Sequence, residues 1–198
     1  VMTLVLATGV WRMGKKNALV KRLQAVEALG QAGVIAVDKT GTITKNELIV
    51  KKVYIPASKL GENSQLFEIQ GTGYEPKGAI SLSDQIIDPL NHPPFLFLGK
   101  VSALCSSARV MFSEDSQQWR VSGDPTEAAM LVLSEKIGFK KDELEKENPK
   151  IAEIPFDYET KYHIVMQEMG DQNMIVLAGA PESVLSLCDK VRRGDKNV

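Results

Sequence analysis

The chain has 198 residues, of which 43% are hydrophobic and 25% are charged. This length suffices for one ordinary domain or two small ones with a sizeable apolar core. The 24 basic and 25 acidic residues give a formal net charge of −1, so the chain lacks the global positive field that gathers nucleic acid or an anionic membrane surface. We therefore expect no nucleic-acid partner, and any anion site must be local.

The cysteines and histidines offer no metal or redox motif. Cys105 and Cys188 stand far apart in the sequence and in no metal-like or redox-like spacing. We expect both to be buried thiols in a reducing compartment, with a disulfide as the alternative. His92 lies in a proline-rich loop and is interpreted as a solvated surface residue, and neither histidine has a second ligand at metal spacing.

The N-terminal segment is apolar and ends in a cluster of basic residues. Residues 1–11 carry no charge, and five basic residues follow them: Arg12, Lys15, Lys16, Lys21 and Arg22. An apolar run this short cannot cross a bilayer core, which needs about 20 residues in a helix, yet basic residues just beyond such a run mark the cytosolic side of a membrane span. We expect residues 1–14 to be the truncated cytosolic end of a transmembrane helix. A signal peptide fits less well, because its charges precede the apolar run, and a buried soluble helix or strand is the alternative.

The next elements lead to an aspartate. Residues 17–29 carry apolar side chains at helical spacing and precede two glycines, which predicts one amphipathic helix. Residues 34–37, Val-Ile-Ala-Val, are typical of a buried parallel strand that delivers Asp38 to its carboxyl end. In open α/β sheets this edge binds ligands. Residues 47–55 suggest another strand, which leads into a second domain.

The middle of the chain alternates turn signals with periodic segments. Residues 56–94 are rich in Gly, Pro, Ser and Asn, which predicts turns around short strands. Helical character returns over residues 95–110, and residues 119–121 indicate a strand. Asp124 has the position of an N-cap for a helix over residues 125–137, with proline at its first position and a glutamate three residues after the cap.

The last third predicts a hairpin and a helix. Residues 140–150 form a mixed charge run, interpreted as a solvated helix or connector. Two β-like runs, 162–169 and 173–178, flank Gly170-Asp171-Gln172, which indicates a hairpin whose turn is longer than the minimal type. Pro181 then opens a final helix.

Asp38 heads the run Asp38-Lys39-Thr40-Gly41-Thr42. A carboxylate is a nucleophile that can form an aspartyl phosphate. Attack on a phosphoryl group needs a cation to shield two anions and donors to hold the phosphate oxygens. Mg²⁺, together with the backbone and hydroxyls of Thr40, Gly41 and Thr42, can supply part of this. An isolated aspartate in such a place is more simply part of a strand-to-loop turn.

The complete run is more specific and resembles the phosphorylation motif of P-type cation-transporting ATPases. Residues 16–23 and 25–30 resemble the segment that joins a transmembrane helix to this motif in the calcium and sodium-potassium branch of the family. The resemblance implies that Asp38 accepts the γ-phosphoryl group of ATP and binds Mg²⁺. It also implies that the Thr40 carbonyl is a second metal ligand and that Thr40 and Gly41 contact the phosphate. The candidate catalytic residues are Asp38, Lys39, Thr40, Gly41 and Thr42.

Phosphatases of the haloacid-dehalogenase type are the nearest rival family, because they share the fold and the aspartate nucleophile. Those enzymes normally carry a second aspartate two residues after the first, as acid and base for hydrolysis. Thr40 stands at that position here. Without a built-in acid and base the phosphoenzyme should be long-lived, which suits a pump that couples it to a conformational change.

Two runs in the second half resemble nucleotide-domain motifs of the family. Residues 123–127, Gly-Asp-Pro-Thr-Glu, are similar to the motif whose glutamate reaches the adenine pocket, which makes Glu127 the candidate there. Residues 155–157, Pro-Phe-Asp, are similar to the family's run with a downstream lysine, here Lys161. An exposed Phe156 can stack on adenine and Lys161 can offset phosphate charge. Taken singly, these runs are also typical of a capped helix, a core phenylalanine and a surface lysine.

A third run departs from the family pattern. Residues 179–182, Gly-Ala-Pro-Glu, resemble a nucleotide-domain motif that normally begins with a lysine, where this chain has Ala178. The missing ammonium should weaken nucleotide binding or leave the task to Lys161, so only Gly179 is carried over as a nucleotide-binding residue. His163 stands where the family usually has methionine and is interpreted as a packing residue.

The resemblance divides the chain into three parts: the end of a transmembrane helix (1–14), the start of a phosphorylation domain (15–46) and a nucleotide-binding domain (47–198). The expected fold class is α/β, or α+β. It combines an antiparallel-sheet nucleotide-binding domain with flanking helices and the first strand of a haloacid-dehalogenase-like Rossmann domain. Family members also have an actuator Thr-Gly-Glu loop, a Gly-Asp-Gly-Asn-Asp hinge that completes the Mg²⁺ site, and a membrane domain. None of these occurs in this sequence.

We therefore expect a fragment of an ATP-driven cation transporter that lies at the cytosolic face of a membrane. The implied cofactors are ATP and Mg²⁺. The implied partners are the membrane, through the parent's transmembrane helices, and the transported cation. The fragment itself is expected to be soluble, to bind ATP and not to be catalytically competent alone. A haloacid-dehalogenase-type phosphatase and a nucleotide-binding module without catalysis are the alternatives.

Overall fold

The computed structural model describes residues 2–57, 63–190, 192–193 and 196–197. The chain forms two compact units, Val1–Lys45 and Asn46–Val198. The assignment of residues 1–14, 15–46 and 47–198 to parts of a parent protein stays a prediction.

The described residues of the first unit form two α-helices, α1 (Met2–Gly14) and α2 (Gln24–Gly30). The helix predicted over residues 17–29 is wrong in its first half. Asn17 takes a left-handed conformation with φ 61°, and the next amide, Ala18 N–H, donates to the carbonyl of Met13 at 3.0 Å. This geometry closes α1 and turns the chain, so the second helix begins only at Gln24. No helix among the described residues is long and apolar enough to cross a membrane.

Residues 34–37 do not form the strand that their apolar sequence predicts. They have no strand assignment, and Val34 and Ile35 are 88% and 81% exposed. A parallel strand is stabilised by neighbours that pair with it and cover both faces. No described segment of this chain pairs with residues 34–37, so the run stays extended and exposed.

The second unit begins with a four-stranded antiparallel sheet in the order β1-β2-β3-β4. Phe67 and Ile69 alternate with exposed neighbours along β2 and face the core. Strands β2, β3 and β4 lie in the segment 56–94, for which turns around short strands were predicted. Residues 58–62 of this segment lie outside the described residues. The strands of the sheet are β1 (Lys52–Ile55), β2 (Gln65–Ile69), β3 (Ile80–Leu82) and β4 (Gln85–Ile86).

Two antiparallel helices, α3 (Pro93–Cys105) and α4 (Pro125–Ile137), form the centre of this unit. Phe95 stacks on Phe67 of β2 with ring centroids 4.3 Å apart. Gly99 permits a close approach of the two helices, because a Cβ at this position would lie 2.7 Å from Ile137 Cδ1. A short 3-10 helix, η2 (Pro89–Asn91), precedes α3.

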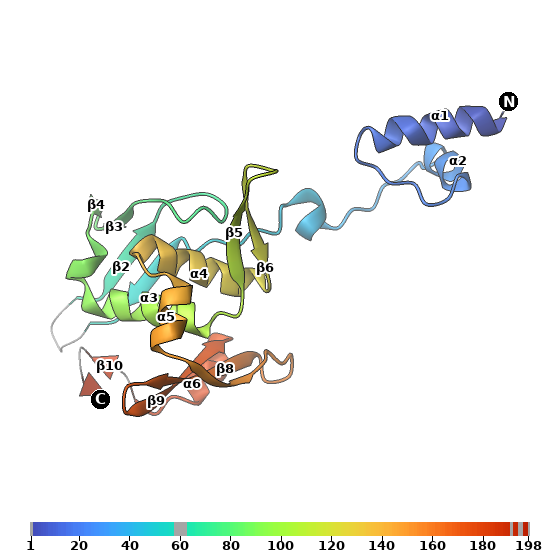
Figure 1. Cartoon of the computed structure of the whole chain (residues 1–198). Helices are drawn as coiled ribbons and strands as arrows, with labels where there is room; N and C mark the ends of the chain where they lie inside the picture. The colour runs from blue at the N-terminus through green and yellow to red at the C-terminus, as the bar shows by residue number, and fades with distance from the viewer. Residues whose placement is uncertain (1, 58–62, 191, 194–195, 198) are drawn as a thin grey trace. The chain divides into compact units, whose positions relative to one another are not determined.

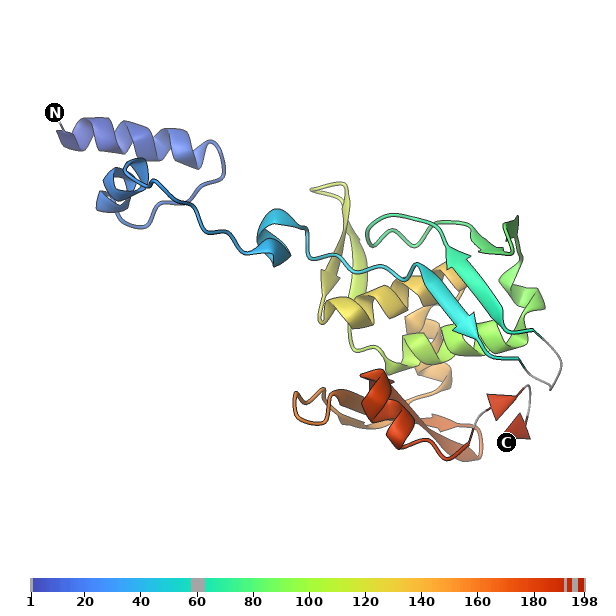
Figure 2. The ribbon, with the colours of Figure 1, turned by 180° about the vertical axis from the view of Figure 1, so that it is seen from behind.

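Three further sheets occur in the described part of the second unit, one of which is the two-stranded pair β10–β11. A hairpin, β5–β6, packs on α4, and a three-stranded antiparallel sheet in the order β7-β8-β9 packs on α3. Both views place α3 between that sheet and the β1–β4 sheet (Figures 1 and 2). The elements are β5 (Arg109–Ser113), β6 (Gln118–Ser122), α5 (Lys141–Glu147), β7 (Lys150–Ile154), β8 (Tyr162–Met169), β9 (Gln172–Gly179), α6 (Pro181–Ser186), β10 (Arg192–Arg193) and β11 (Lys196–Asn197).

The predicted mixed fold, antiparallel sheets with flanking helices, is confirmed for this unit, as are α4 and the β8–β9 hairpin. Two details differ. The helix predicted over residues 95–110 ends at Cys105, because Arg109 already pairs with Ser122 in a hairpin. The β8–β9 turn is of the minimal kind, because Met169 pairs with Gln172 and leaves only two residues in the loop.

The cap of α4 gives a stability prediction. Asp124 Oδ1 accepts from the amides of Thr126 at 2.8 Å and Glu127 at 3.2 Å. Replacement of Asp124 by Ala leaves these amides without their partner and should lower the free energy of unfolding by about 1 kcal/mol. Urea denaturation of the full chain measures the change. Asp124→Asn keeps a side-chain oxygen and should retain most of the stability, and equal losses for both variants would contradict the capping role.

Candidate functional site

The loop that begins at Asp38 is an exposed turn. All residues from 38 to 42 are exposed. The loop closes through Thr44, whose amide and hydroxyl both donate to the carbonyl of Lys39, at 3.0 and 3.2 Å. Gly41 has φ 75°, a left-handed conformation that glycine adopts without steric cost. The motif therefore presents backbone groups, hydroxyls and a carboxylate to solvent.

The donor atoms of this loop fit Mg²⁺ in kind. The Asp38 carboxylate and the Thr40 carbonyl are oxygen ligands, which Mg²⁺ prefers, and this ion usually keeps several waters and substrate phosphate oxygens in its shell. No group of three or more His, Cys, Asp or Glu side chains that could hold a metal occurs in the described part of the chain. The loop thus offers two protein ligands for Mg²⁺, and a bound phosphate group would supply further oxygen ligands.

Phe156 and Lys161 lie in the connection between β7 and β8. Phe156 is 49% exposed, and Tyr158 packs against it edge to face with ring centroids 5.5 Å apart. The carboxylate of Asp157 accepts from the amides of Thr160 at 2.9 Å and Glu159 at 3.0 Å. These bonds, that from Thr160 first, lower the pKa of Asp157. The aspartate thus shapes a turn that presents an aromatic face at one end and an ammonium group at the other.

Gly179 lies against the base of the same turn. A Cβ at this position would lie 2.3 Å from the carbonyl oxygen of Lys161 and 2.5 Å from Tyr162 Cα, so the close approach requires glycine. The next residue, Ala180, donates its amide to that carbonyl at 2.9 Å. The Lys161 ammonium lies 3.9 Å from Glu182 Oε1 of α6. The structure therefore brings three of the predicted nucleotide residues, Phe156, Lys161 and Gly179, to one end of the β7–β9 sheet.

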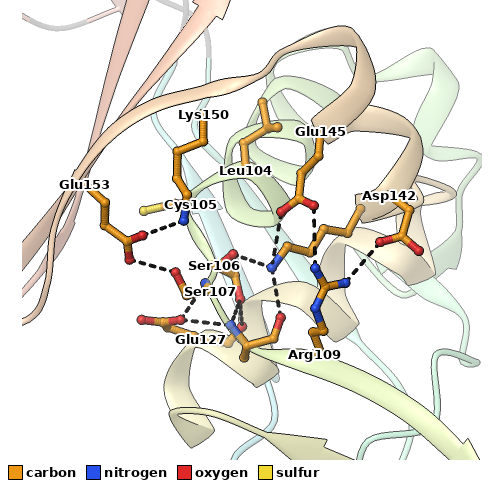
Figure 3. Close-up of polar contacts among 12 residues, drawn as sticks. Leu104, Cys105, Ser106, Ser107, Arg109, Glu127, Asp142, Glu145, Lys150 and Glu153 are labelled. Carbon is orange, nitrogen blue, oxygen red and sulfur yellow. Dashed lines mark hydrogen bonds and ion pairs between the residues drawn. The ribbon is translucent and has the colours of Figure 1, made fainter.

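Glu127 does not close the capping box that its spacing suggests. Its Oε2 accepts from the amide of Ser107 at 2.6 Å and that of Ala108 at 3.1 Å (Figure 3). These amides belong to the α3–β5 loop, residues 106–108. The carboxylate is thereby fixed at the N-terminal end of α4, with its side chain 17% exposed and its second oxygen directed toward His163.

The α3–β5 loop is also held from its other side by Lys141. Its ammonium donates to the carbonyls of Ser106 at 2.5 Å and Ala108 at 2.9 Å, and it lies 3.6 Å from Glu145 Oε1. Burial lowers the pKa of Lys141, and the charge of Glu145 opposes this shift. The interpretation of residues 140–150 as a solvated segment is therefore wrong for Lys141, which is buried because loop carbonyls replace its water.

Ser107 connects this loop to β7. Its hydroxyl donates to Glu153 Oε1 at 2.7 Å, and the Lys150 ammonium lies 2.5 Å from Glu153 Oε2 (Figure 3). The hydrogen bonds from Lys150 and then Ser107 lower the pKa of Glu153. Since Phe156 follows Glu153 by three residues, one loop links the position of Glu127 to that of the aromatic ring.

Side chains of β8 satisfy the last carbonyls of α3. His163 Nε2 lies 2.8 Å from Cys105 O, and Gln167 Nε2 donates to Leu104 O at 2.6 Å. His163 is buried, as predicted, but it acts as a polar partner and not only as a packing residue. Ala178 is its direct neighbour on β9, so both side chains share one face of the sheet. His163 therefore lies between Ala178, which precedes Gly179, and the Glu127 carboxylate.

Two expectations about individual residues are wrong. Cys105 is buried, but Cys188, which follows α6, is exposed. The Cys188 thiol donates to Val184 O at 3.3 Å. His92 is not a solvated surface residue. It is partly buried, and its ring meets Phe67 edge to face at 5.3 Å. Both cysteines are free thiols.

The comparison with known families agrees with the resemblance of the motifs. The model of the family "P-type ATPase, cytoplasmic domain N" matches residues 97–198, about half of the chain. This chain therefore belongs to the P-type cation-transporting ATPases.

Individual relatives align with nearly the whole chain. It is 35% identical over 94% of its length to the "Probable cation-transporting ATPase F" of Mycobacterium tuberculosis. It is 36% identical over 98% to the "Cation-transporting ATPase pma1" of Synechocystis, and 33% identical over 96% to a "Calcium-transporting ATPase" of Bacillus subtilis. The chain covers 20 to 21% of the length of these relatives.

Sequence reasoning missed Ser107, Lys141 and Glu153, and it assigned His163 no polar contact. Ser107 is one of two adjacent serines after a helix, and Lys141 and Glu153 belong to ordinary charged segments. The contacts that join these residues to one another, to the α3–β5 loop or to Glu127 span 20 or more positions in the chain. No local spacing signals such contacts, so only the packing of α3, α4, α5 and β7 reveals them.

The Glu153 network predicts a dependence of stability on pH. The folded pKa of Glu153 is lowered from its ordinary value of 4.5. The stabilisation is therefore fully present above that value and is lost as pH falls through the folded pKa. The difference in unfolding free energy between wild type and Glu153→Gln should be constant near pH 7 and should shrink in acid. Urea denaturation at several pH values measures it. Glu114→Gln, in the exposed β5–β6 turn, is the control and should show no such trend.

Proposed function

We propose that the second unit binds ATP at the end of the β7–β9 sheet. The observation that carries this proposal is the convergence of Phe156, Lys161 and Gly179 on one turn. A half-exposed aromatic ring offers a face to a purine base, and the ammonium offers charge to phosphate. Gly179 lets β9 lie directly against the backbone of Lys161, because a Cβ there would lie 2.3 Å from the carbonyl oxygen of that lysine.

Glu127 is proposed to take part in the same site. Its Oε2 is occupied by the two loop amides, which leaves Oε1 as an acceptor. A carboxylate is an acceptor only, so it selects a ligand group that donates, such as the exocyclic amine of adenine. The register of β8 and β9 supports a common site, since the Ala178 side chain adjoins His163 and His163 faces Glu127.

For the parent protein we propose ATP-driven cation transport through an aspartyl phosphate. A carboxylate oxygen of Asp38 attacks the γ-phosphorus, the bond from that phosphorus to the bridging oxygen breaks, and ADP leaves. Mg²⁺ held by Asp38 and Thr40 would offset the negative charge of the phosphoryl group. Lys39, Gly41 and Thr42 complete the proposed catalytic loop and offer an ammonium, a backbone amide and a hydroxyl to phosphate oxygens.

The division of the parent into parts remains part of this proposal. Residues 1–14 are proposed as the end of a transmembrane helix, residues 15–46 as the start of the phosphorylation domain and residues 47–198 as the nucleotide-binding domain. The chain alone is proposed to bind ATP without completing the catalytic cycle. The family match favours a P-type ATPase over a phosphatase of the haloacid-dehalogenase type.

Titration with ATP tests the binding site. Amide resonances near Phe156 and Glu127 should shift in the full chain at millimolar nucleotide. Phe156→Ala and Lys161→Ala should each weaken binding by about tenfold, which corresponds to the loss of one stacking or charge contact of about 1.4 kcal/mol. Tyr158→Ala is the matched control, because it removes the 88% exposed neighbouring ring and should keep at least half of the affinity. Absence of any shift would refute the assignment.

Phosphorylation of the full-length parent tests the role of Asp38. Incubation with ATP should yield an acid-stable phosphate that hydroxylamine removes, as expected for an acyl phosphate. Asp38→Asn should abolish the label, whereas the matched variant Asp84→Asn in the β3–β4 turn should keep it. A label of equal intensity in Asp38→Asn would place the phosphate elsewhere.

A further inference from the structure

His163 is a buried polar side chain for which the proposed function gives no role. It is 5% exposed. Its Nε2 lies 2.8 Å from the carbonyl oxygen of Cys105 and 3.0 Å from that residue's thiol sulfur. Its Nδ1 lies 4.0 Å from Glu127 Oε1. The ring therefore lies between the end of α3 and a proposed ligand-binding carboxylate.

The contact with Cys105 determines which nitrogen carries the proton in the neutral ring. A carbonyl oxygen only accepts, so Nε2 donates to it and Nδ1 is left with a lone pair. That lone pair then faces the Glu127 carboxylate, which is also an acceptor. The two groups repel each other until a proton on Nδ1 turns the contact into an ion pair.

Several other charged or polar groups also face His163. Glu153 of β7 interacts electrostatically with the imidazole, although its own partner is Lys150. The C-terminal end of α3 places the negative end of a helix dipole against the ring. Burial, followed by the charges of Glu127 and Glu153, raises the pKa of the Cys105 thiol to about 12, so the thiol stays neutral. On β9 the neighbour is the uncharged Ala178.

We propose that His163 is a positioning residue that makes the orientation of Glu127 depend on pH, and this inference rests on the proposed nucleotide site. Imidazole is the side chain whose charge ordinarily changes between about pH 5 and 8. Glu127 Oε2 is held by Ser107 and Ala108 in both states, so only Oε1 is free to respond. The neutral ring repels Oε1 toward the ligand side, and the protonated ring draws it toward β8.

This coupling has a direction. An Oε1 that is paired with a protonated His163 is less available to a donor group of a ligand. Nucleotide affinity should therefore fall as pH falls, beyond any change caused by protonation of the nucleotide itself. By linkage, a ligand that engages Glu127 releases the proton from His163.

The first experiment observes the coupling without a ligand, by NMR of the full chain between about pH 5.5 and 8. The imidazole signals of His163 and the amide signals of Ser107 and Ala108 should shift in one common step. His163→Gln keeps an amide donor for Cys105 O but takes no proton, so the amide step should vanish, and His163→Met should give the same result. His92→Gln removes the other histidine and should preserve the step. An amide step that survives in His163→Gln, or no step in wild type, overturns the proposal.

The second experiment measures ATP affinity at both ends of this pH range. Wild type should lose about fivefold more affinity in acid than His163→Gln, a value typical of weak coupling between sites. Because both proteins bind the same nucleotide, the ratio cancels the protonation of ATP. Equal losses in the two proteins would overturn the inference and leave ATP binding intact. Failure of both proteins to bind ATP would refute the proposed function. The NMR titration without ligand would then be the test of the coupling between His163 and Glu127.

Discussion

The α3–β5 loop, residues 106–108, is held between two opposite charges, and the geometry of the candidate site depends on this arrangement. Its amides point to the carboxylate of Glu127, and its carbonyls point to the ammonium of Lys141. Each charge satisfies backbone groups that would otherwise be unpaired in a largely buried place. A charged group bound to several backbone dipoles is also more strongly fixed than one bound to a mobile side chain.

The consequences extend to three neighbouring elements. Ser107 links the loop to Glu153 of β7, and the loop follows the end of α3, whose carbonyls are bonded by His163 and Gln167. The aromatic and basic residues of the β7–β8 turn are therefore set relative to Glu127 through hydrogen bonds and not only through apolar packing. A site for a charged, planar ligand requires this order, because stacking and acceptor contacts tolerate little displacement.

The parts of the chain that local sequence could predict are those whose partners are local. Asp124 and Pro125 specified the start of α4 because a cap bonds amides two and three residues away. The β8–β9 hairpin followed from two β-like runs around a glycine. The strand over residues 34–37 was predicted wrongly because an apolar run states only that burial is favourable. Pairing partners decide whether a strand forms, and no described segment pairs with it.

The sequence by itself determined the family, through the Asp38 motif and the runs around Glu127, Phe156 and Gly179, and it determined α4 and the β8–β9 hairpin of the second unit. Only the tertiary structure decided that Lys141 is buried, that Ser107 joins two carboxylates and that His163 faces Glu127. These contacts join residues 20 to 46 positions apart. Local periodicity does not predict contacts between residues so far apart in the sequence. These contacts arise when helices and sheets pack and bring unpaired backbone groups next to charged side chains.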